Sequence, residues 1–211
     1  MTAEQQKRRD LNVVAGLIPE GSRVLDLGCG DGEFLRSLQE QKQISALGVE
    51  IDPAMIRRCI ANGVFVIQSD LDAPLTFAED QSFDVVVLSH TLQQLHRPDH
   101  LLREIVRVGK TAVVSFINFG HFPCRWRLLT GGKMPETAAI PYHWYDTPNI
   151  HLGTISDFRQ LCNKLGITIL REIPIGTRCN RVANLWPNLL APGCVFELTR
   201  REKKNQDSKF Q

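Results

Sequence analysis

The sequence lacks the features that mark membrane, secreted and zinc-binding proteins. No apolar run approaches the roughly 18 residues of a membrane-spanning helix, and the polar start MTAEQQKRRDL is unlike a signal peptide. None of the six cysteines belongs to a C-x-x-C pair, so neither a zinc site nor a small disulfide scaffold is indicated. We therefore expect a cytoplasmic protein without a structural metal. We expect reduced thiols at Cys29, Cys59, Cys124, Cys162, Cys179 and Cys194.

An excess of charge of one sign is also absent from most of the chain. The formal net charge is +2, and residues 200–211 alone carry five basic and two acidic residues, so the remainder is close to neutral. A body without a basic stripe argues against nucleic acid as the main partner. The segment 200–211 has no hydrophobic period, and we expect a disordered basic tail after a single domain over residues 1–199.

What the sequence does contain is a regular alternation of strand and helix patterns. Of its 211 residues, 43% are hydrophobic and 23% are charged, which is the composition of a globular domain. The alternation indicates βαβ units around a parallel sheet. It predicts strands at Arg23–Leu27, Ser45–Val49, Phe65–Gln68, Asp84–Leu88 and Thr111–Phe116. It predicts helices over about Glu4–Leu17, Gly32–Gln39, Pro53–Ala61 (with Asp52 as N-cap) and Asp99–Val108.

The alternation stops after Phe116. Residues 118–153 contain four prolines, a Gly131-Gly132 pair and a cluster of aromatic and histidine residues. We expect a loop-like insertion that serves as a lid or a docking segment, because long loops within a domain are usually functional. A helix near Ser156–Leu165 should follow, and then two strands that could pair antiparallel, Ile167–Ile173 and Cys194–Leu198.

A glycine-rich turn follows the first expected strand, in VLDLGCGDGEF (Val24–Phe34). It departs from the G-x-G-x-x-G pattern of dinucleotide sites, since Glu33 stands where the third glycine would be. The acids Asp26, Asp31 and Glu33 oppose a pyrophosphate, which a bare helix N-terminus would otherwise favour. The same acids favour a cationic ligand whose carboxylate can meet the loop amides. S-adenosylmethionine, with an ammonium, a sulfonium and one carboxylate, has these properties.

Two further acids come at the ends of the next two strands. Glu50 lies 20 residues beyond Gly30, where an acid can accept hydrogen bonds from ribose hydroxyls. Asp70 can accept from the adenine amine, while Leu71 offers its backbone and an apolar contact. Each acid alone could be a cap or a turn residue. The ordered set, at the carboxyl ends of three strands, favours an adenosyl site.

These motifs resemble a known family. VLDLGCGDG, GVEID, SDLD and FDVVVLSHTLQQL are similar to the class I S-adenosylmethionine-dependent methyltransferase fold. FINFGHF and GGKMPETAAIPYHWYDTPNIHLGTISDF resemble the MetW family of methionine-biosynthesis proteins. The resemblance implies an α/β, Rossmann-like sheet of seven strands with the last antiparallel and helices on both faces. It implies cofactor contacts at Asp26, Gly28, Cys29, Gly30, Gly32, Glu50, Ile51, Asp70, Leu71, Ser89 and His90. For Cys29 we expect only the backbone to matter.

A catalytic base for methyl transfer is not obvious. The main candidates are His90, His143 and Tyr145, while Trp126 and Trp144 could instead pack the insertion or form a patch for a partner. Other polar candidates are His96, His121, Tyr142, Asp146 and His151. The basic residues Arg125, Arg127 and Lys133 could bind an acidic substrate or simply be solvated.

The family resemblance also implies a partner. MetW proteins are associated with homoserine O-acyltransferase and are thought to support its activity by binding it. No G-x-S-x-G motif of a serine hydrolase is present in the sequence, so we do not expect this chain to perform the acylation itself. It could bind S-adenosylmethionine or S-adenosylhomocysteine and regulate the acyltransferase. The alternative is a methyltransferase acting on a small molecule.

Overall fold

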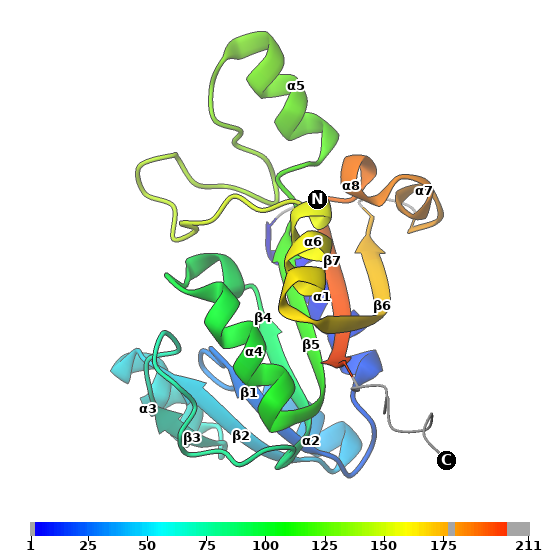
Figure 1. Cartoon of the computed structure of the whole chain (residues 1–211). Coiled ribbons are helices and arrows are strands. Elements are labelled where there is room, and N and C mark those ends of the chain that lie inside the picture. Colours follow the sequence, from blue (N-terminus) through cyan, green and yellow to red (C-terminus); the bar gives the residue numbers. More distant parts are fainter. Residues whose placement is uncertain (1–2, 177–179, 202–211) are drawn as a thin grey trace, which may run out of the picture.

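A seven-stranded sheet forms the centre of the computed structural model, which describes residues 3–176 and 180–201 (Figure 1). The strand order is β3-β2-β1-β4-β5-β7-β6. The pairs from β3 to β5 are parallel, whereas β7 runs antiparallel to both β5 and β6. This confirms the expected mostly parallel sheet with an antiparallel last strand. The strands are β1 (Arg23–Leu27), β2 (Ser45–Glu50), β3 (Phe65–Gln68), β4 (Phe83–Ser89), β5 (Gly109–Ile117), β6 (Ile167–Ile175) and β7 (Gly193–Arg200).

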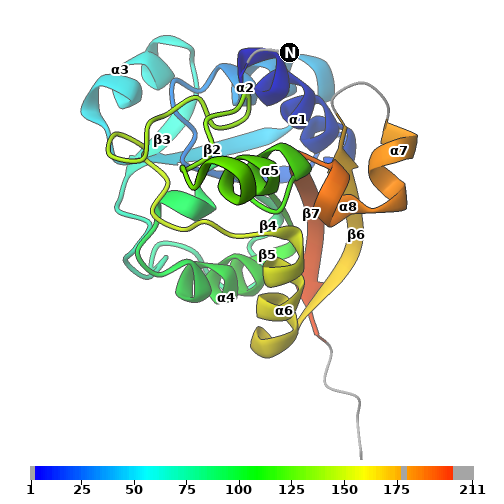
Figure 2. The same cartoon turned by 90° about the horizontal axis from the view of Figure 1, so that it is seen from above.

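Helices cover both faces of the sheet, as Figure 2 shows from above. Successive strand residues point to opposite faces, so Val24 packs into the cluster under the first three helices and Leu25 into the cluster on the other side. One face carries α1 (Ala3–Leu17), α2 (Glu33–Lys42) and α3 (Pro53–Ala61). The other carries α4 (Pro98–Val108) and α6 (Ile155–Leu165).

The predicted elements are confirmed, with their ends displaced by no more than three residues. The start of α3 is as expected: the Asp52 carboxylate accepts a hydrogen bond from the Ala54 amide, and Pro53 occupies the first turn. The predicted antiparallel pair is β6 with β7. Four short elements were not predicted: the 3₁₀ turn η1 (Leu92–Gln94), α5 (Phe122–Gly131), α7 (Asn180–Leu185) and α8 (Pro187–Leu190).

The expectation of a loop-like insertion over residues 118–153 is wrong for ten of its residues, which form α5. Pro123 lies in the first turn, where a missing N–H costs no hydrogen bond, so it starts the helix instead of breaking it. Gly132 ends the helix in a left-handed conformation, with φ 58°. In Figure 1 α5 projects away from the sheet. We call residues 118–153 the arm.

The cysteines that the structure describes are all free and buried, and burial raises the pKa of the Cys162 thiol to about 12. Cys179 and most of the predicted tail, from residue 202 onward, lie outside the described residues. Strand β7 reaches Arg200, one residue beyond the expected end of the domain. Within the described ranges no helix is long and apolar enough to cross a membrane, and no cluster of side chains has the composition of a metal site.

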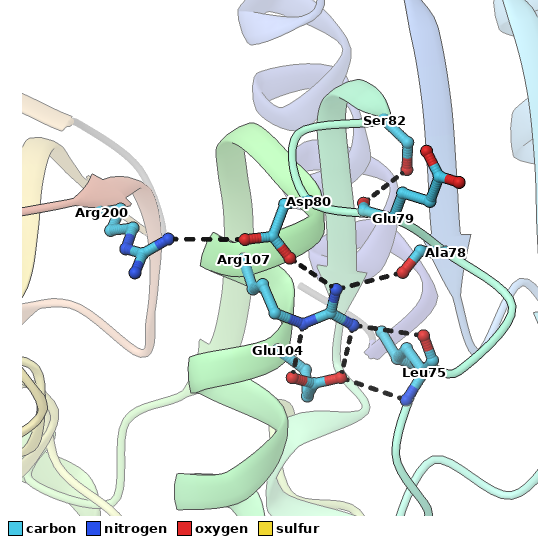
Figure 3. A network of polar contacts seen from close by, with 8 residues as sticks. All are labelled: Leu75, Ala78, Glu79, Asp80, Ser82, Glu104, Arg107 and Arg200. Atoms are coloured by element: carbon cyan, nitrogen blue, oxygen red, sulfur yellow. Dashed lines mark hydrogen bonds and ion pairs between the residues drawn. The ribbon is translucent and has the colours of Figure 1, made fainter.

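A charged network fastens the β3–β4 connection to α4 (Figure 3). The Arg107 guanidinium donates to both carboxylate oxygens of Glu104 at 2.8 Å and to Asp80 at 2.9 Å. It also donates to the carbonyl oxygens of Leu75 and Ala78. These hydrogen bonds satisfy backbone groups of a connection that belongs to neither a helix nor a strand.

Replacing Arg107 with methionine should therefore lower the free energy of unfolding by about 2–3 kcal/mol, because two carbonyls and two carboxylates lose a donor. Chemical denaturation would measure this loss. The exposed Arg36, paired with Glu40 on α2, is the matched control, and Arg36→Met should cost under about 0.5 kcal/mol.

Hydrogen bonds from Arg107 lower the pKa of Glu104. The stabilisation is thus complete above the unfolded carboxyl pKa of about 4.3 and declines as the pH falls below it. Equal losses of unfolding free energy in Arg107→Met and Arg36→Met would contradict the role of the network.

Candidate functional site at the carboxyl edge of the sheet

The glycine turn after β1 folds tightly against its neighbours. The amides of Gly28 and Cys29 both donate to the Val49 carbonyl, at 2.8 and 3.1 Å. Gly28, Gly30 and Gly32 all have positive φ, at 81°, 60° and 76°. This conformation is disfavoured for residues with a Cβ.

The three glycines differ in what surrounds them. A Cβ at Gly28 would lie 2.6 Å from Thr91 Oγ1, and one at Gly32 would lie 2.6 Å from Cys59 Sγ. A Cβ at Gly30 would meet no protein atom within 4 Å. Two of the glycines therefore permit close packing of the protein on itself, whereas Gly30 borders open space.

Glu50, at the end of β2, holds the glycine turn directly. Its Oε2 accepts a hydrogen bond from the Gly30 amide at 2.9 Å, and its Oε1 accepts from the amides of Ile51 and Asp52 at 2.8 and 3.0 Å. Since a carboxylate oxygen has two lone pairs, Oε2 can accept one more hydrogen bond. The predicted acid is therefore fixed in place beside the open side of the turn. The Ile51 side chain, in contrast, is exposed.

The end of β3 lies next to that of β2, where the Ser69 amide donates to the Glu50 carbonyl at 3.2 Å. Asp70 is exposed, and its Oδ1 accepts from the Asp72 amide at 2.9 Å. The Leu71 side chain is buried in the core. The two acids expected from the sequence, Glu50 and Asp70, thus come from adjacent strand ends.

The Cys29 side chain is not incidental, contrary to expectation. A Cβ at Gly48 would lie 2.5 Å from Cys29 Sγ, and this sulfur is 3.5 Å from Cys59 Sγ. The thiol thus occupies the space beneath the turn. Burial is the main cause that raises the pKa of Cys29, and the nearby Asp26 carboxylate adds to it. The thiol is therefore a packing group.

His90 follows β4 and has a left-handed backbone, with φ 56°. Its amide donates to the Ser115 carbonyl at 3.0 Å, and the Ser89 and Ser115 hydroxyls are 2.9 Å apart. His90 Nε2 lies 2.9 Å from Oδ2 of Asp10, a buried carboxylate of α1. The next residue, Thr91, lies against Gly28. His90 therefore flanks the glycine turn on the side opposite Glu50.

The other two catalytic candidates make their contacts within the arm. The rings of His143 and Tyr145 stack with centroids 5.3 Å apart, and the Glu136 carboxylate, 3.1 Å from His143 Nδ1, raises the pKa of that imidazole. No described contact joins His143 or Tyr145 to the glycine turn or to His90. A catalytic role for either stays a prediction. Viewed from above, the part of the arm after α5 extends over the β2–β3 side of the sheet (Figure 2).

Three of the other candidates, His96, His121 and Arg125, have structural contacts. The His96 amide donates to Asp72, and His121 is the N-cap of α5, where burial lowers its pKa. Arg125, considered for an acidic substrate, donates to the backbone carbonyls of Gly120 and Asn188 and so fastens the base of the arm.

Asp10 and Gln93 were not among the predicted site residues. Gln93 is buried and donates to the carbonyls of Ile117 and His151, tying the arm to the end of β5. Beside it lies a cavity of about 110 Å³, lined mainly by Leu92, Pro98, Phe116, Phe158 and Leu161. The sequence did contain a signal for Asp10: it lies four residues before the apolar Val14 on α1 and eight before Ile18, which follows the helix, and all three are buried.

Comparison with known proteins defines the class of fold. A possible histamine N-methyltransferase from Thermotoga maritima superimposes with a TM-score of 0.68 at 19% identity, over 94% of this chain and 91% of that one. An S-adenosylmethionine-dependent methyltransferase from Mesorhizobium loti gives 0.67 at 19% identity, over 92% and 98%. At these identities the likeness concerns the fold alone, which is that of the class I S-adenosylmethionine-dependent methyltransferases.

Within this class, the chain belongs to the MetW family. The family model, described as methionine biosynthesis protein MetW, matches residues 8–198. The bifunctional methionine biosynthesis protein MetXA/MetW of Rhodopirellula baltica is 34% identical over 173 residues, which are 78% of this chain and 28% of the relative. The 27-O-demethylrifamycin SV methyltransferase of Amycolatopsis mediterranei is 29% identical over 133 residues, 55% of this chain and 47% of the relative. The chain thus spans less than half the length of these curated relatives.

Proposed function

We propose that this chain binds S-adenosylmethionine or S-adenosylhomocysteine and acts as an accessory or regulatory partner of homoserine O-acyltransferase in the cytoplasm. The observation that carries the proposal is the MetXA/MetW relative, in which a MetW part shares one polypeptide with a second methionine-biosynthesis activity. Two functions joined in one chain by fusion are commonly performed by associated proteins where the chains are separate.

The open side of the glycine turn supports the nucleoside part of the proposal. Gly30 leaves room for a ligand at its α-carbon, and Glu50 Oε2 beside it can accept a further hydrogen bond, as from a ribose hydroxyl. Asp70 is exposed at the next strand end, where an adenine amine could donate to it. Bound S-adenosylmethionine would supply a transferable methyl group there. A mainly acidic rim favours this positively charged ligand over a negatively charged diphosphate.

The arm supports the partner part of the proposal. Trp126 and Leu129 on α5 are 54% and 82% exposed, and Trp144 and Tyr145 in the following segment are also exposed. Large aromatic side chains that the protein does not bury itself are the usual anchors of protein interfaces. We propose the arm as the surface that docks on the acyltransferase.

Reconstitution with purified components tests the partnership. The chain and the homoserine O-acyltransferase of the same cell should co-elute in gel filtration, and the acyl-transfer rate should change when this chain is added. The nucleosides, titrated into the mixture, should alter that rate. Separate elution together with an unchanged rate would refute the accessory role.

Replacing Glu50 with alanine should weaken nucleoside binding by about 1–3 kcal/mol, because the ribose loses a charged acceptor and the Gly30 amide loses its partner. Isothermal titration calorimetry with S-adenosylhomocysteine measures the change. Glu40 on α2 is an exposed acid whose carboxylate pairs with Arg36 instead of the Gly30 amide, and Glu40→Ala should leave the affinity unchanged. If Glu50→Ala binds as tightly as the unaltered protein, the nucleoside lies elsewhere.

A methyltransferase acting on a small molecule is the second candidate function. The observation that favours it is the apolar cavity of about 110 Å³ at the end of β5, next to the β4 end that carries His90. Such a cavity could receive the apolar part of an acceptor. Incubation with radiolabelled S-adenosylmethionine and a small-molecule extract of the same cell tests this. Label recovered only in unreacted cofactor would contradict it.

A further inference from the structure

A buried carboxylate, that of Asp10, lies beside the residue that follows β4. Asp10 comes from α1, its side chain is 2% exposed, and its Oδ2 lies 2.9 Å from His90 Nε2. The His90 side chain is 21% exposed, but its Nε2 atom is buried. Although the distance is that of an ion pair, Nε2 has no hydrogen bond of good geometry within the described residues. Buried polar atoms left in this state are rare in native proteins and call for an explanation.

The backbone conformation of His90 is a second unusual feature at this contact. A residue with a Cβ at φ 56° is strained, and such strain gathers at functional sites. The strained conformation is held from both ends: the His90 amide donates to Ser115, and the His90 carbonyl accepts from Gln94 Nε2 at 3.0 Å. The protein therefore fixes the imidazole against Asp10 at an energetic cost.

The order of the strands places this pair near one end of the proposed ligand, so the role of the pair rests on the proposed function. Along the sheet edge, Asp70, Glu50, the glycine turn and His90 follow β3, β2, β1 and β4, which are neighbours in that order. A nucleoside with adenine at Asp70 and ribose at Glu50 directs its sulfur and amino-acid end toward β1 and β4. The sulfur therefore comes nearest to the His90 side.

We propose that the Asp10–His90 pair lets this site distinguish the positively charged sulfonium of S-adenosylmethionine from the neutral thioether of S-adenosylhomocysteine. The Asp10 carboxylate is buried, so water and salt screen it little, and its negative charge favours a cation nearby but not a neutral sulfur. His90, which contacts Asp10 and directly precedes the Thr91 that lies against Gly28, carries this influence through its polarised ring. Asp10 acts on the ligand through His90 and is a positioning residue.

The test compares two affinities in the full-length chain. Calorimetry gives the dissociation constants of S-adenosylmethionine and S-adenosylhomocysteine for the unaltered protein and for Asp10→Asn, which keeps the shape and removes the charge. We expect Asp10→Asn to weaken S-adenosylmethionine binding by about tenfold and to leave S-adenosylhomocysteine binding unchanged within about twofold. The second ligand thus serves as an internal control for folding, because a merely structural effect would weaken both equally.

An unchanged ratio of the two affinities would overturn the inference, whether both affinities fall equally or neither changes. If Asp10→Asn does not fold, His90→Asn replaces it, since asparagine tolerates a left-handed backbone and removes the ring. The same shift in the ratio is expected there, with the same contrary outcomes. Should the unaltered protein bind neither nucleoside, the proposed function itself fails, and that result is distinct from binding without discrimination.

Discussion

Replacing Gly30 with valine is expected to weaken S-adenosylhomocysteine binding at least about a hundredfold, the largest effect of any single substitution at this site. Two causes act together. A β-branched residue is strongly disfavoured at the φ of 60° that Gly30 adopts. In addition, its side chain would occupy the open space beside the Glu50 carboxylate, where the proposed ligand lies.

A second glycine separates these causes. Gly63, in the turn after α3, also has positive φ, at 74°, and a Cβ there would meet nothing within 4 Å. Gly63→Val should thus impose a similar backbone strain, about 1–2 kcal/mol, without touching the site. We expect it to lower the melting temperature but to bind as the unaltered protein does. If Gly30→Val retains full affinity, the ligand does not lie against the turn.

Replacing Trp126 and Leu129 together with serine should abolish co-elution with homoserine O-acyltransferase, corresponding to a loss of about a hundredfold or more in affinity. Both side chains are largely exposed on α5, so their removal should cost the isolated chain little stability. Nucleoside binding should be unaffected, because the glycine turn makes none of its described contacts with α5.

Phe65 provides the matched control for this double substitution. It is 77% exposed and begins β3, so it lies at the amino end of that strand and not at the carboxyl edge of the sheet, and Phe65→Ser should leave co-elution intact. If the double variant still co-elutes and still changes the acyl-transfer rate, the arm is not the docking surface. If Phe65→Ser is the variant that fails to co-elute, the interface lies at the amino end of β3.

The sheet and the acids around the glycine turn were predictable because each depends on local sequence. Strands such as β4 are continuous apolar runs, since both of their faces are buried, and parallel strands place their carboxyl ends at one edge. Glu50 and Asp70 could therefore be predicted to lie at adjacent strand ends, after β2 and β3. The packing role of the Cys29 side chain depends on Gly48 and Cys59, which are distant in sequence.

The arm and the Asp10–His90 pair could not be predicted in the same way. In a sequence, prolines and glycines usually indicate loops. Here, however, Pro123 lies in the first turn of α5 and Gly132 ends that helix. The contact between Asp10 and His90 spans 80 positions of sequence and exists only once α1 packs on the sheet. Gln93 likewise gains its role from the carbonyl groups that tertiary structure brings to it.

The position of β7 in the sheet affects how the chain folds during its synthesis. Strand β7 follows β6 in the sequence but is inserted between β5 and β6, so neither of those strands has its full set of partners until β7 has been synthesised. Until then both present unpaired edges, which invite association with other nascent chains. A chain truncated before Gly193 would therefore be expected to aggregate instead of forming a shortened working protein.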